Sequence, residues 1–189
     1  MNRMTVRLLL INAAAWAIWI GVPGSTHAAI IAQSQTIPLT ITTVNQNLTF
    51  NQFNPALGTL NSVTVSMSSS FFADVTTLQN NDAVAQTLTY NANGTFNLTN
   101  ASPLALNNVA AIAPQMFTLN PGDSVSFNAS AAANSVMMDP NLPFYTGAGT
   151  FSFNFTATGV SNASGAGNIL LVDLLSAGAT VNVLYDYTP

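Results

Sequence analysis

The chain has 189 residues, of which only 4% are charged and 49% are hydrophobic. Its two basic residues, Arg3 and Arg7, and its one histidine, His27, lie near the start, so residues 29–189 contain no Lys, Arg, His, Cys or Glu. For residues 29–189 this excludes a Ser-His-Asp or Cys-His catalytic site, a lysine Schiff base, an imidazole-bound zinc ion and a disulfide bridge. It also excludes the cationic surface on which nucleic-acid binding depends.

Residues 1–28 have the layout of a secretory signal peptide, in which a basic head precedes an apolar run from Leu8 to Val22. The small residues Thr26 and Ala28 stand where a signal peptidase requires them, so we expect cleavage after Ala28. An uncleaved membrane anchor is the alternative, but about 15 apolar residues fall short of the roughly 20 that span a bilayer. We therefore expect residues 29–189 to be exported as one domain, without membrane insertion after cleavage.

Apolar residues in 29–189 recur at every second position, which is the period of a strand with one buried face. The alternation is found in four segments: Ile37–Ile41, Val63–Met67, Phe151–Phe155 and Val181–Tyr187. Strands of this kind, separated by turns rich in Asn, Gly and Pro, are typical of antiparallel sheets. The sequence therefore predicts an all-β domain, an antiparallel β-sandwich or jelly roll.

Turn signals divide the segments further. Asn91–Gly94, between two apolar runs, predicts a hairpin, and the glycines of Gly159–Gly167 predict a loop. The other predicted turns are Asn54–Gly58, Asn80–Asp82, Asn120–Asp123 and Gly147–Gly149. Two alanine-rich stretches, Leu104–Pro114 and Ala129–Met138, are predicted to be short helices or covering loops.

The six aspartates are the only charged side chains of residues 29–189: Asp74, Asp82, Asp123, Asp139, Asp173 and Asp186. A pair of them could act as acid and base in glycoside hydrolysis, and three Asp/Asn clusters, Asn80–Asp82, Asn120–Asp123 and Asp139–Asn141, could supply oxygen ligands for calcium. None of the clusters has the ligand spacing of a dedicated calcium loop, so turn capping is the favoured interpretation. We predict no catalytic, metal-binding or cofactor-binding residue.

Several segments resemble the choice-of-anchor E domain family of exported bacterial proteins. They are Gln52–Leu60 (QFNPALGTL) with the following Val63–Val65 strand, Phe144–Thr150 (FYTGAGT), the Ser161–Asn168 loop and the closing Val181–Tyr187 strand. The resemblance implies an extracytoplasmic β domain that family members tether by different C-terminal sorting signals, and it implies no biochemical activity. Because this chain ends at Pro189 with no apolar tail, we expect release, or retention by contacts alone.

The leading hypothesis is a non-enzymatic, secreted or cell-surface protein with a structural or adhesive role. A carbohydrate-binding module is one alternative, with surface glycans as partners, and it would need exposed aromatic residues such as Phe71, Phe72, Phe144 and Tyr145 on one face. Another alternative is a filament subunit that donates the strand Ile30–Thr43 to a neighbour. Sheet edges are normally protected by lysine or other charges, and lysine is absent here, so self-association of the protein is a further hypothesis.

Overall fold

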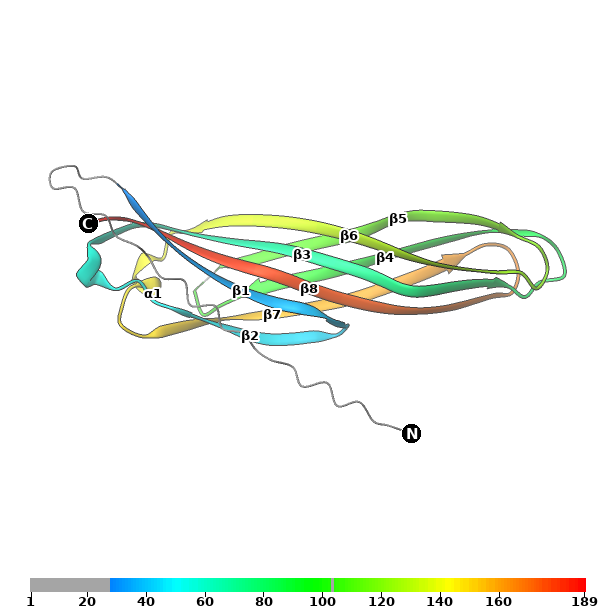
Figure 1. Cartoon of the computed structure of the whole chain (residues 1–189), viewed down its shortest axis with the longest axis horizontal. Coiled ribbons are helices and arrows are strands. Elements are labelled where there is room, and N and C mark those ends of the chain that lie inside the picture. Colours follow the sequence, from blue (N-terminus) through cyan, green and yellow to red (C-terminus); the bar gives the residue numbers. More distant parts are fainter. Residues whose placement is uncertain (1–27, 103) are drawn as a thin grey trace, which may run out of the picture.

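The computed structural model describes residues 28–102 and 104–189, so the predicted signal peptide lies outside the described residues except for Ala28. Eight antiparallel strands form two four-stranded sheets (Figure 1). The strands are β1 (Ala29–Ile41), β2 (Val44–Asn51), β3 (Thr59–Asn80), β4 (Gln86–Thr99), β5 (Ala105–Leu119), β6 (Ser124–Asp139), β7 (Thr150–Ser164) and β8 (Ile169–Thr188). A 3₁₀ turn, η1 (Pro55–Leu57), precedes β3, and one helical turn, α1 (Leu142–Tyr145), precedes β7.

The strand order identifies the fold as a jelly roll. One sheet has the order β1-β8-β3-β6 and is called here the β1 sheet; the other has the order β2-β7-β4-β5 and is called the β2 sheet. The pairs β1–β8, β2–β7, β3–β6 and β4–β5 are nested, as if one long hairpin had been rolled up, and this is the arrangement of a jelly roll. The predicted all-β sandwich is therefore confirmed.

Period-two alternation positions the core between the two sheets. In β7 the side chains of Phe151, Phe153 and Phe155 are buried, whereas Ser152 and Asn154 between them are exposed. Successive strand side chains point to opposite faces, so each strand gives one row to the core and one to solvent. The core is aromatic along this strand, with the rings of Phe151 and Phe153 in edge contact at 5.4 Å between centroids.

The hairpin predicted at Asn91–Gly94 is wrong, because β4 runs without a turn through these residues. Gly94 lies opposite Gly159 of β7, and the ring of Phe71 from the β1 sheet packs over both glycines. A Cβ built on Gly94 would lie 2.6 Å from Phe71 Cδ2, and one on Gly159 would lie 2.9 Å from Phe71 Cε2. The two glycines therefore leave space for the Phe71 ring and do not form a turn. Gly159 lies in β7 and not in the predicted loop.

The prediction of helices or loops in the alanine-rich stretches is also wrong, because Leu104–Pro114 lies almost wholly in β5 and Ala129–Met138 lies in β6. The two sheets approach closely where β5 faces β6. Asn108 Nδ2 of β5 donates hydrogen bonds across the sandwich to the carbonyl oxygens of Met67 and Ala133, each 3.2 Å away. Small side chains are needed where the sheets are this close, and that requirement outweighs the helix propensity of alanine.

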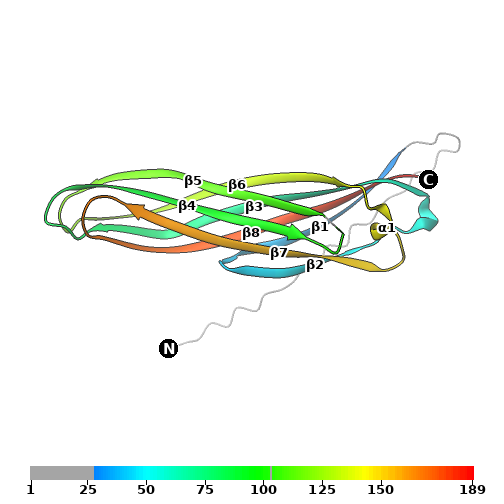
Figure 2. The ribbon, with the colours of Figure 1, turned by 180° about the vertical axis from the view of Figure 1, so that it is seen from behind.

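The sandwich is elongated, and its two ends differ. The end with η1, α1 and the C-terminus is called here the proximal end, and the end with the β3–β4, β5–β6 and β7–β8 connections is called the distal end (Figures 1 and 2). Strand β1 pairs with β8 only along Ser176–Tyr187, and β2 pairs with β7 only along Thr150–Ala157. Each sheet thus has four strands proximally and three distally. Within the described residues, no helix has the length and hydropathy required to cross a membrane.

Candidate functional site

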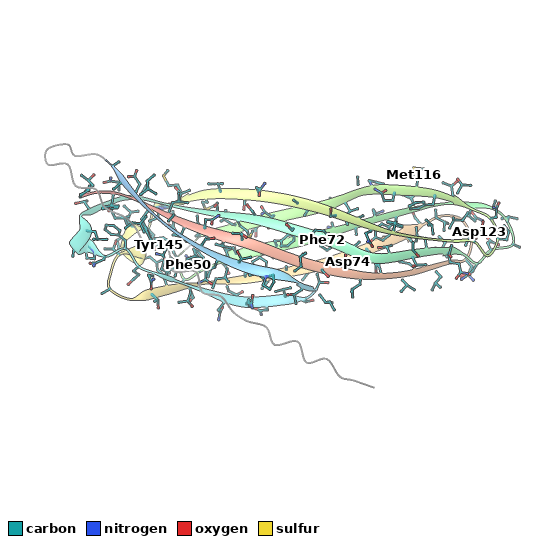
Figure 3. All side chains as sticks on the ribbon, in the orientation of Figure 1. Phe50, Phe72, Asp74, Met116, Asp123 and Tyr145 are labelled. Carbon is teal, nitrogen blue, oxygen red and sulfur yellow. The ribbon has the colours of Figure 1, made fainter. Side chains whose placement is uncertain are left out.

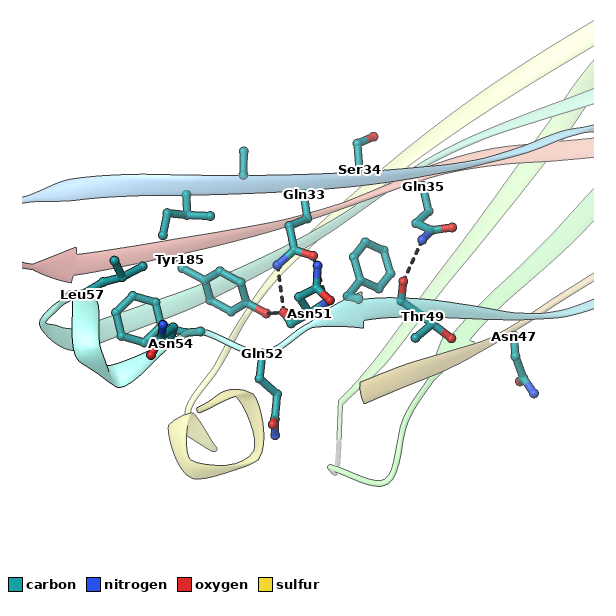
Figure 4. Close-up of a pocket in the computed structure, with 14 residues that line it drawn as sticks. Gln33, Ser34, Gln35, Asn47, Thr49, Asn51, Gln52, Asn54, Leu57 and Tyr185 are labelled. Atoms are coloured by element: carbon teal, nitrogen blue, oxygen red, sulfur yellow. Dashed lines mark hydrogen bonds between the residues drawn. The ribbon is translucent and has the colours of Figure 1, made fainter. Parts of the chain in front are cut away.

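A groove separates the edge strands β1 and β2 in the proximal half of the molecule (Figure 4). Its volume is about 720 Å³. Its walls are residues 31–35 of β1 and residues 47 and 49–51 of β2, continued by residues 52–54 and Leu57. Among the ionisable side chains of residues 28–102 and 104–189, only Tyr185 of β8 lines it. The groove is therefore a neutral, amide-rich surface rather than a site equipped for acid–base chemistry.

Two glutamines of β1 cover the free backbone edge of β2, as the dashed lines of Figure 4 show. Gln33 Nε2 donates to the carbonyl oxygen of Asn51 at 2.8 Å, and the Asn51 N–H donates to Gln33 Oε1 at 2.9 Å. Gln35 Nε2 donates to the carbonyl oxygen of Thr49 at 2.7 Å. The side chain of Gln33 thus forms the two hydrogen bonds that a neighbouring strand would form, which blocks this edge against strand addition.

Tyr185 of β8, which also lines the groove, adds a further hydrogen bond to the edge of β2. Its hydroxyl donates to the carbonyl oxygen of Asn51 at 2.7 Å, so that oxygen accepts from both Gln33 and Tyr185. Burial raises the pKa of Tyr185 well above the ordinary tyrosine value. The phenol therefore stays protonated and remains a donor, and it supports the edge of β2 instead of serving as a base.

A second polar cluster lies at the proximal end beside α1, where Figure 3 labels Tyr145. Asp139, at the end of β6, is buried, and its Oδ2 accepts from Tyr145 Oη at 2.7 Å and from Ser102 Oγ at 3.1 Å. Asn141 N–H donates to Asp139 Oδ1 at 2.9 Å, and Asn100 Nδ2 donates to Tyr145 Oη at 3.1 Å. Burial, with the neighbouring Asp139 carboxylate, raises the pKa of Tyr145. These hydrogen bonds link the β4–β5 connection to α1, so the role of the cluster is structural.

A second carboxylate, that of Asp173, faces the interior near the distal end. Tyr90 Oη of β4 donates to Asp173 Oδ2 of β8 at 3.0 Å and so links the two sheets. Burial, followed by the Asp173 carboxylate, raises the pKa of Tyr90 from 10.0 to about 12. The sequence favoured turn capping for the Asp139–Asn141 cluster and gave no indication for Asp173, yet both carboxylates face the interior of the sandwich.

The turn interpretation applies to Asp82 and Asp123, which lie in the distal connections; Figure 3 labels Asp123 at this end. Asp82 Oδ1 accepts from the N–H of Ala83 at 2.7 Å, and Asp123 Oδ2 accepts from Nδ2 of Asn120 at 3.0 Å. The structure brings the two corresponding calcium candidates together, since the N–H of Asn80 donates to the carbonyl oxygen of Asp123 at 3.0 Å. The third candidate, at Asp139, lies at the proximal end. In the part of the chain that the structure describes, no three His, Cys, Asp or Glu side chains gather to hold a metal ion.

Two structural features bear on the alternative functions. Phe71 and Tyr145 have no exposed surface, Phe72 and Phe144 are half-buried, and no aromatic side chain among the described residues is exposed. The described part of the chain therefore presents no exposed aromatic ring for stacking against a sugar. A filament subunit would donate its N-terminal strand to a neighbour. In this structure that strand, β1 (Ala29–Ile41), pairs with β8 of its own chain.

The outer face of the β2 sheet carries rows of neutral polar side chains. Register places Asn45, Thr156, Asn97 and Asn107 in one row across all four strands, from β2 to β5. Within the row Asn97 Nδ2 donates to Thr156 Oγ1 at 3.5 Å. In the adjacent row Asn154 Nδ2 donates to the side-chain oxygens of Asn45 at 2.9 Å and of Asn47 at 3.2 Å. This face therefore presents amide and hydroxyl groups in register and carries no charge within these rows.

Neither sequence comparison finds a relative: no family model matches the chain, and no curated protein does. Among solved structures, the chain is similar to a chain of "Structure of infectious bursal disease virus Gx strain", with 12% sequence identity and a TM-score of 0.14. The match covers 86% of this chain and 41% of that chain, so this protein spans less than half the length of that structure's chain. A score this low carries no argument about fold or function.

Sequence reasoning missed the two glutamines that cap β2. A signal for them is present, because Gln33 and Gln35 lie two residues apart in a predicted strand and so share one face with the core residue Ile37. Polar side chains at core-facing positions of a strand indicate either a hydrogen-bonded network or a sheet edge. Which of the two applies depends on β2, whose position the sequence does not reveal.

Proposed function

We propose that this protein is a non-enzymatic, secreted or cell-surface β-sandwich with a structural or adhesive role, in keeping with its resemblance to choice-of-anchor E domains. The observation that supports this most is on the outer face of the β2 sheet, where the Asn and Thr side chains of one row lie side by side across all four strands. Amides and hydroxyls both donate and accept hydrogen bonds, so such a face suits neutral partners rich in the same groups.

The composition supports the same proposal. The described residues contain no Lys, Arg or His, so binding through this face does not rest on ion pairs. Ion-pair binding weakens as salt screens the charges, whereas hydrogen bonding between neutral groups is far less sensitive to ionic strength. An adhesive contact made by this face is therefore expected to persist at high salt.

An adhesion assay under flow tests the proposal. Beads coated with residues 29–189 are passed over a surface bearing a neutral polysaccharide, and their retention is measured at low and high salt. We expect retention at both salt concentrations, and loss of retention in the double variant Asn97→Ala/Asn107→Ala. The control Ser68→Ala/Asn134→Ala removes two neutral polar groups, one hydroxyl and one amide, from one row on the outer face of the β1 sheet. Equal retention of the two variants, or retention only at low salt, would count against the proposal.

The location is tested separately by labelling intact cells with an antibody against residues 29–189. The proposal expects labelling of unbroken cells or recovery of the protein from the culture medium. Recovery only from the interior of broken cells would refute an extracytoplasmic role, whatever the adhesion assay shows.

A further inference from the structure

The free side of β1 carries unpaired backbone groups. β1 is the first strand in the order β1-β8-β3-β6, so within the described residues no strand pairs with its other side. Its register with β8 is unbroken from Ala29 to Ile37. In an antiparallel pair the N–H and C=O groups of successive residues point alternately toward the neighbouring strand and away from it. Every second residue of this stretch therefore offers a donor and an acceptor to the space beside β1.

A contact with β8 identifies the residues of β1 that point away from it. A Cβ built on Gly178 of β8 would lie 2.9 Å from the carbonyl oxygen of Ile37, so this carbonyl faces β8. Counting back from Ile37 along the unbroken register, Gln33 faces β8 as well. Ala32 and Ser34 lie on either side of Gln33, so their N–H and C=O groups point away from β8.

The alternation along β8 gives the same result. The carbonyl of Leu175 faces β1, because it accepts a hydrogen bond from the Thr42 N–H at 3.0 Å. Val183 lies an even number of residues further along β8, so its backbone also faces β1, and its partner in the register is Gln33. Gln33 and Val183 therefore form a hydrogen-bonded pair, and both neighbours of Gln33 in β1 point outward.

The outward groups border the groove between β1 and β2. Residues 31–35 all line it, and its volume of about 720 Å³ falls within the range of about 300–1,000 Å³ that is typical of ligand sites. Figure 4 shows the side chain of Ser34 pointing away from β2, whereas those of Gln33 and Gln35 point toward it. Ala32 shares the orientation of Ser34, which lies two residues away. These two residues thus border the groove with their free backbone edge.

The chemistry of this edge favours an extended peptide over other ligands. Ala32 and Ser34 each present one donor and one acceptor, two residues apart, which is the pattern that a second strand matches. Sugars are commonly held by aromatic rings, and no aromatic side chain among the described residues is exposed. The one ionisable side chain of the described residues that lines the groove is Tyr185, whose phenol stays protonated. The groove therefore suits a peptide whose side chains carry no charge.

The two walls of the groove differ in what they offer to such a peptide. The edge of β2 is occupied, because two glutamines of β1 bond to its backbone. An incoming strand is therefore expected to join β1. In the proximal part of the groove, Ile31 and Leu57 line the wall, and Leu57 is 47% exposed. They offer an apolar contact to a side chain of the peptide.

We propose that this groove binds an extended, uncharged segment of another protein, which joins β1 as a fifth strand of the β1 sheet. The segment forms backbone hydrogen bonds with Ala32 and Ser34. One row of its side chains faces the glutamines and contacts Ile31 and Leu57, and the other row lies on the outer face of the sheet. A second copy of the chain supplies no such segment from its described residues, because each of its strands pairs within a sheet of its own.

Amide hydrogen exchange of residues 29–189, measured by NMR, tests which backbone groups are free. The N–H groups of Ala32 and Ser34 should exchange fast in the free protein, whereas that of Gln33 should exchange slowly because it is bonded to β8. Slow exchange of Ala32 and Ser34 would overturn the assignment of the open edge.

The binding probe is acetyl-Thr-Val-Thr-Val-Thr-Val-Thr-amide, an uncharged peptide whose β-branched residues favour an extended backbone. Its addition should slow the exchange of Ala32 and Ser34 and leave that of Gln33 unchanged. The same peptide methylated on every backbone nitrogen lacks the donors and should not bind. Absence of binding by the probe, or equal binding of the methylated peptide, would refute the proposal.

Proline variants test the site on the protein itself. Ala32→Pro removes an outward donor and keeps the pairing with β8, since proline is tolerated on a sheet edge where its nitrogen faces solvent. It is expected to raise the dissociation constant of the probe at least about tenfold. The matched control Ala132→Pro lies in β6, the strand at the other edge of the same sheet, and should leave the constant unchanged. Equal dissociation constants for the two variants would contradict binding at β1.

The control is matched in the direction of its N–H as well. Ser70 of β3 pairs with Gly178 of β8 and with Ala132 of β6. Gly178 lies three residues from Leu175, whose carbonyl faces β1, so the backbone of Gly178 faces β3. Ser70 is therefore bonded to β8, and the N–H of Ala132 points outward. The methylated peptide tests the same hydrogen bonds on the unaltered protein, so the proposal does not depend on the folding of either variant.

Self-association and adhesion give separate outcomes. A dimer in sedimentation equilibrium that Ala32→Pro abolishes and Ala132→Pro keeps would place a second copy at this edge and overturn the proposal. The groove is distinct from the outer face of the β2 sheet, so the inference goes beyond the proposed adhesive role. The double variant Asn97→Ala/Asn107→Ala should bind the probe as the unaltered protein does, and loss of probe binding in it would count against a site at β1.

Discussion

The contact of Phe71 with Gly94 and Gly159 predicts that Gly94→Ala destabilises the fold, although alanine is usually the better residue in a regular strand. The new Cβ would lie 2.6 Å from Phe71 Cδ2, whereas carbon atoms pack best at about 3.5–4.0 Å. Phe71 has no exposed surface, so its ring cannot turn out into solvent. The clash must be relieved by moving the ring or the strand within the core.

The magnitude follows from two opposing effects. Forcing an extra methyl group into a well-packed core costs about 1–3 kcal/mol. Replacing glycine lowers the entropy of the unfolded chain, and this stabilises by about 0.4–1 kcal/mol. We therefore expect Gly94→Ala to lower the free energy of unfolding by about 1–2 kcal/mol.

Urea unfolding of residues 29–189, followed by far-UV circular dichroism, measures this free energy. The midpoint should fall while the slope of the transition stays unchanged. Phe71→Val removes the ring atoms that meet Gly94, so Gly94→Ala should cost much less in that background, with a coupling energy of about 1 kcal/mol or more. Asn93→Ala, the neighbour whose side chain faces outward, is the control and should change the free energy by less than about 0.5 kcal/mol.

A neutral or stabilising effect of Gly94→Ala would refute the argument. So would an effect of the same size in the native and the Phe71→Val backgrounds, because the cost would then arise from the strand itself and not from the ring.

Two further predictions concern polar contacts. Gln33→Ala should speed amide hydrogen exchange at Asn51, whose N–H loses its acceptor, while Gln35→Ala should leave that amide unchanged; NMR exchange rates that are equal in the two variants would contradict the capping of β2. The raised pKa of Tyr90 means that the folded state holds the phenol proton more tightly than the unfolded state, so stability should be intact below pH 10 and fall between pH 10 and about 12. Tyr90→Phe should flatten that fall in urea titrations at alkaline pH, and an unchanged slope would show that Tyr90 does not contribute to it.

Local pattern was sufficient for the fold class. The alternation of Phe151, Phe153 and Phe155 with polar residues identifies a strand wherever it is placed, because the direction of a side chain in a strand depends only on its position in the strand. The turn role of Asp82 and Asp123 is equally local, since each carboxylate bonds to atoms within a few residues. Composition alone also removed whole classes of chemistry from residues 29–189.

The candidate site could be predicted only in part. Gln33 and Gln35 are visible in the sequence as polar residues on a core-facing row, but their acceptors, Asn51 and Thr49, belong to a strand of the opposite sheet. Asp139 stands beside a proline and a turn, so its position suggested a solvated turn residue. Its burial results from Tyr145 and Ser102, which the fold brings to it from other elements.

What the sequence determined by itself is the period of each strand, the all-β class and the absence of basic, thiol and imidazole groups after residue 28. Only the tertiary structure determines the role of residues whose contacts come from distant parts of the chain. In the sequence Gly94 resembles a turn residue, but in the fold it lies beneath the ring of Phe71. Leu170–Leu174 resembles an ordinary strand, but β1 ends at Ile41 and leaves one edge of this segment unpaired. A strand's conformation is a local property, whereas its neighbours, its free edge and the space above its glycines are set by how the whole chain rolls up.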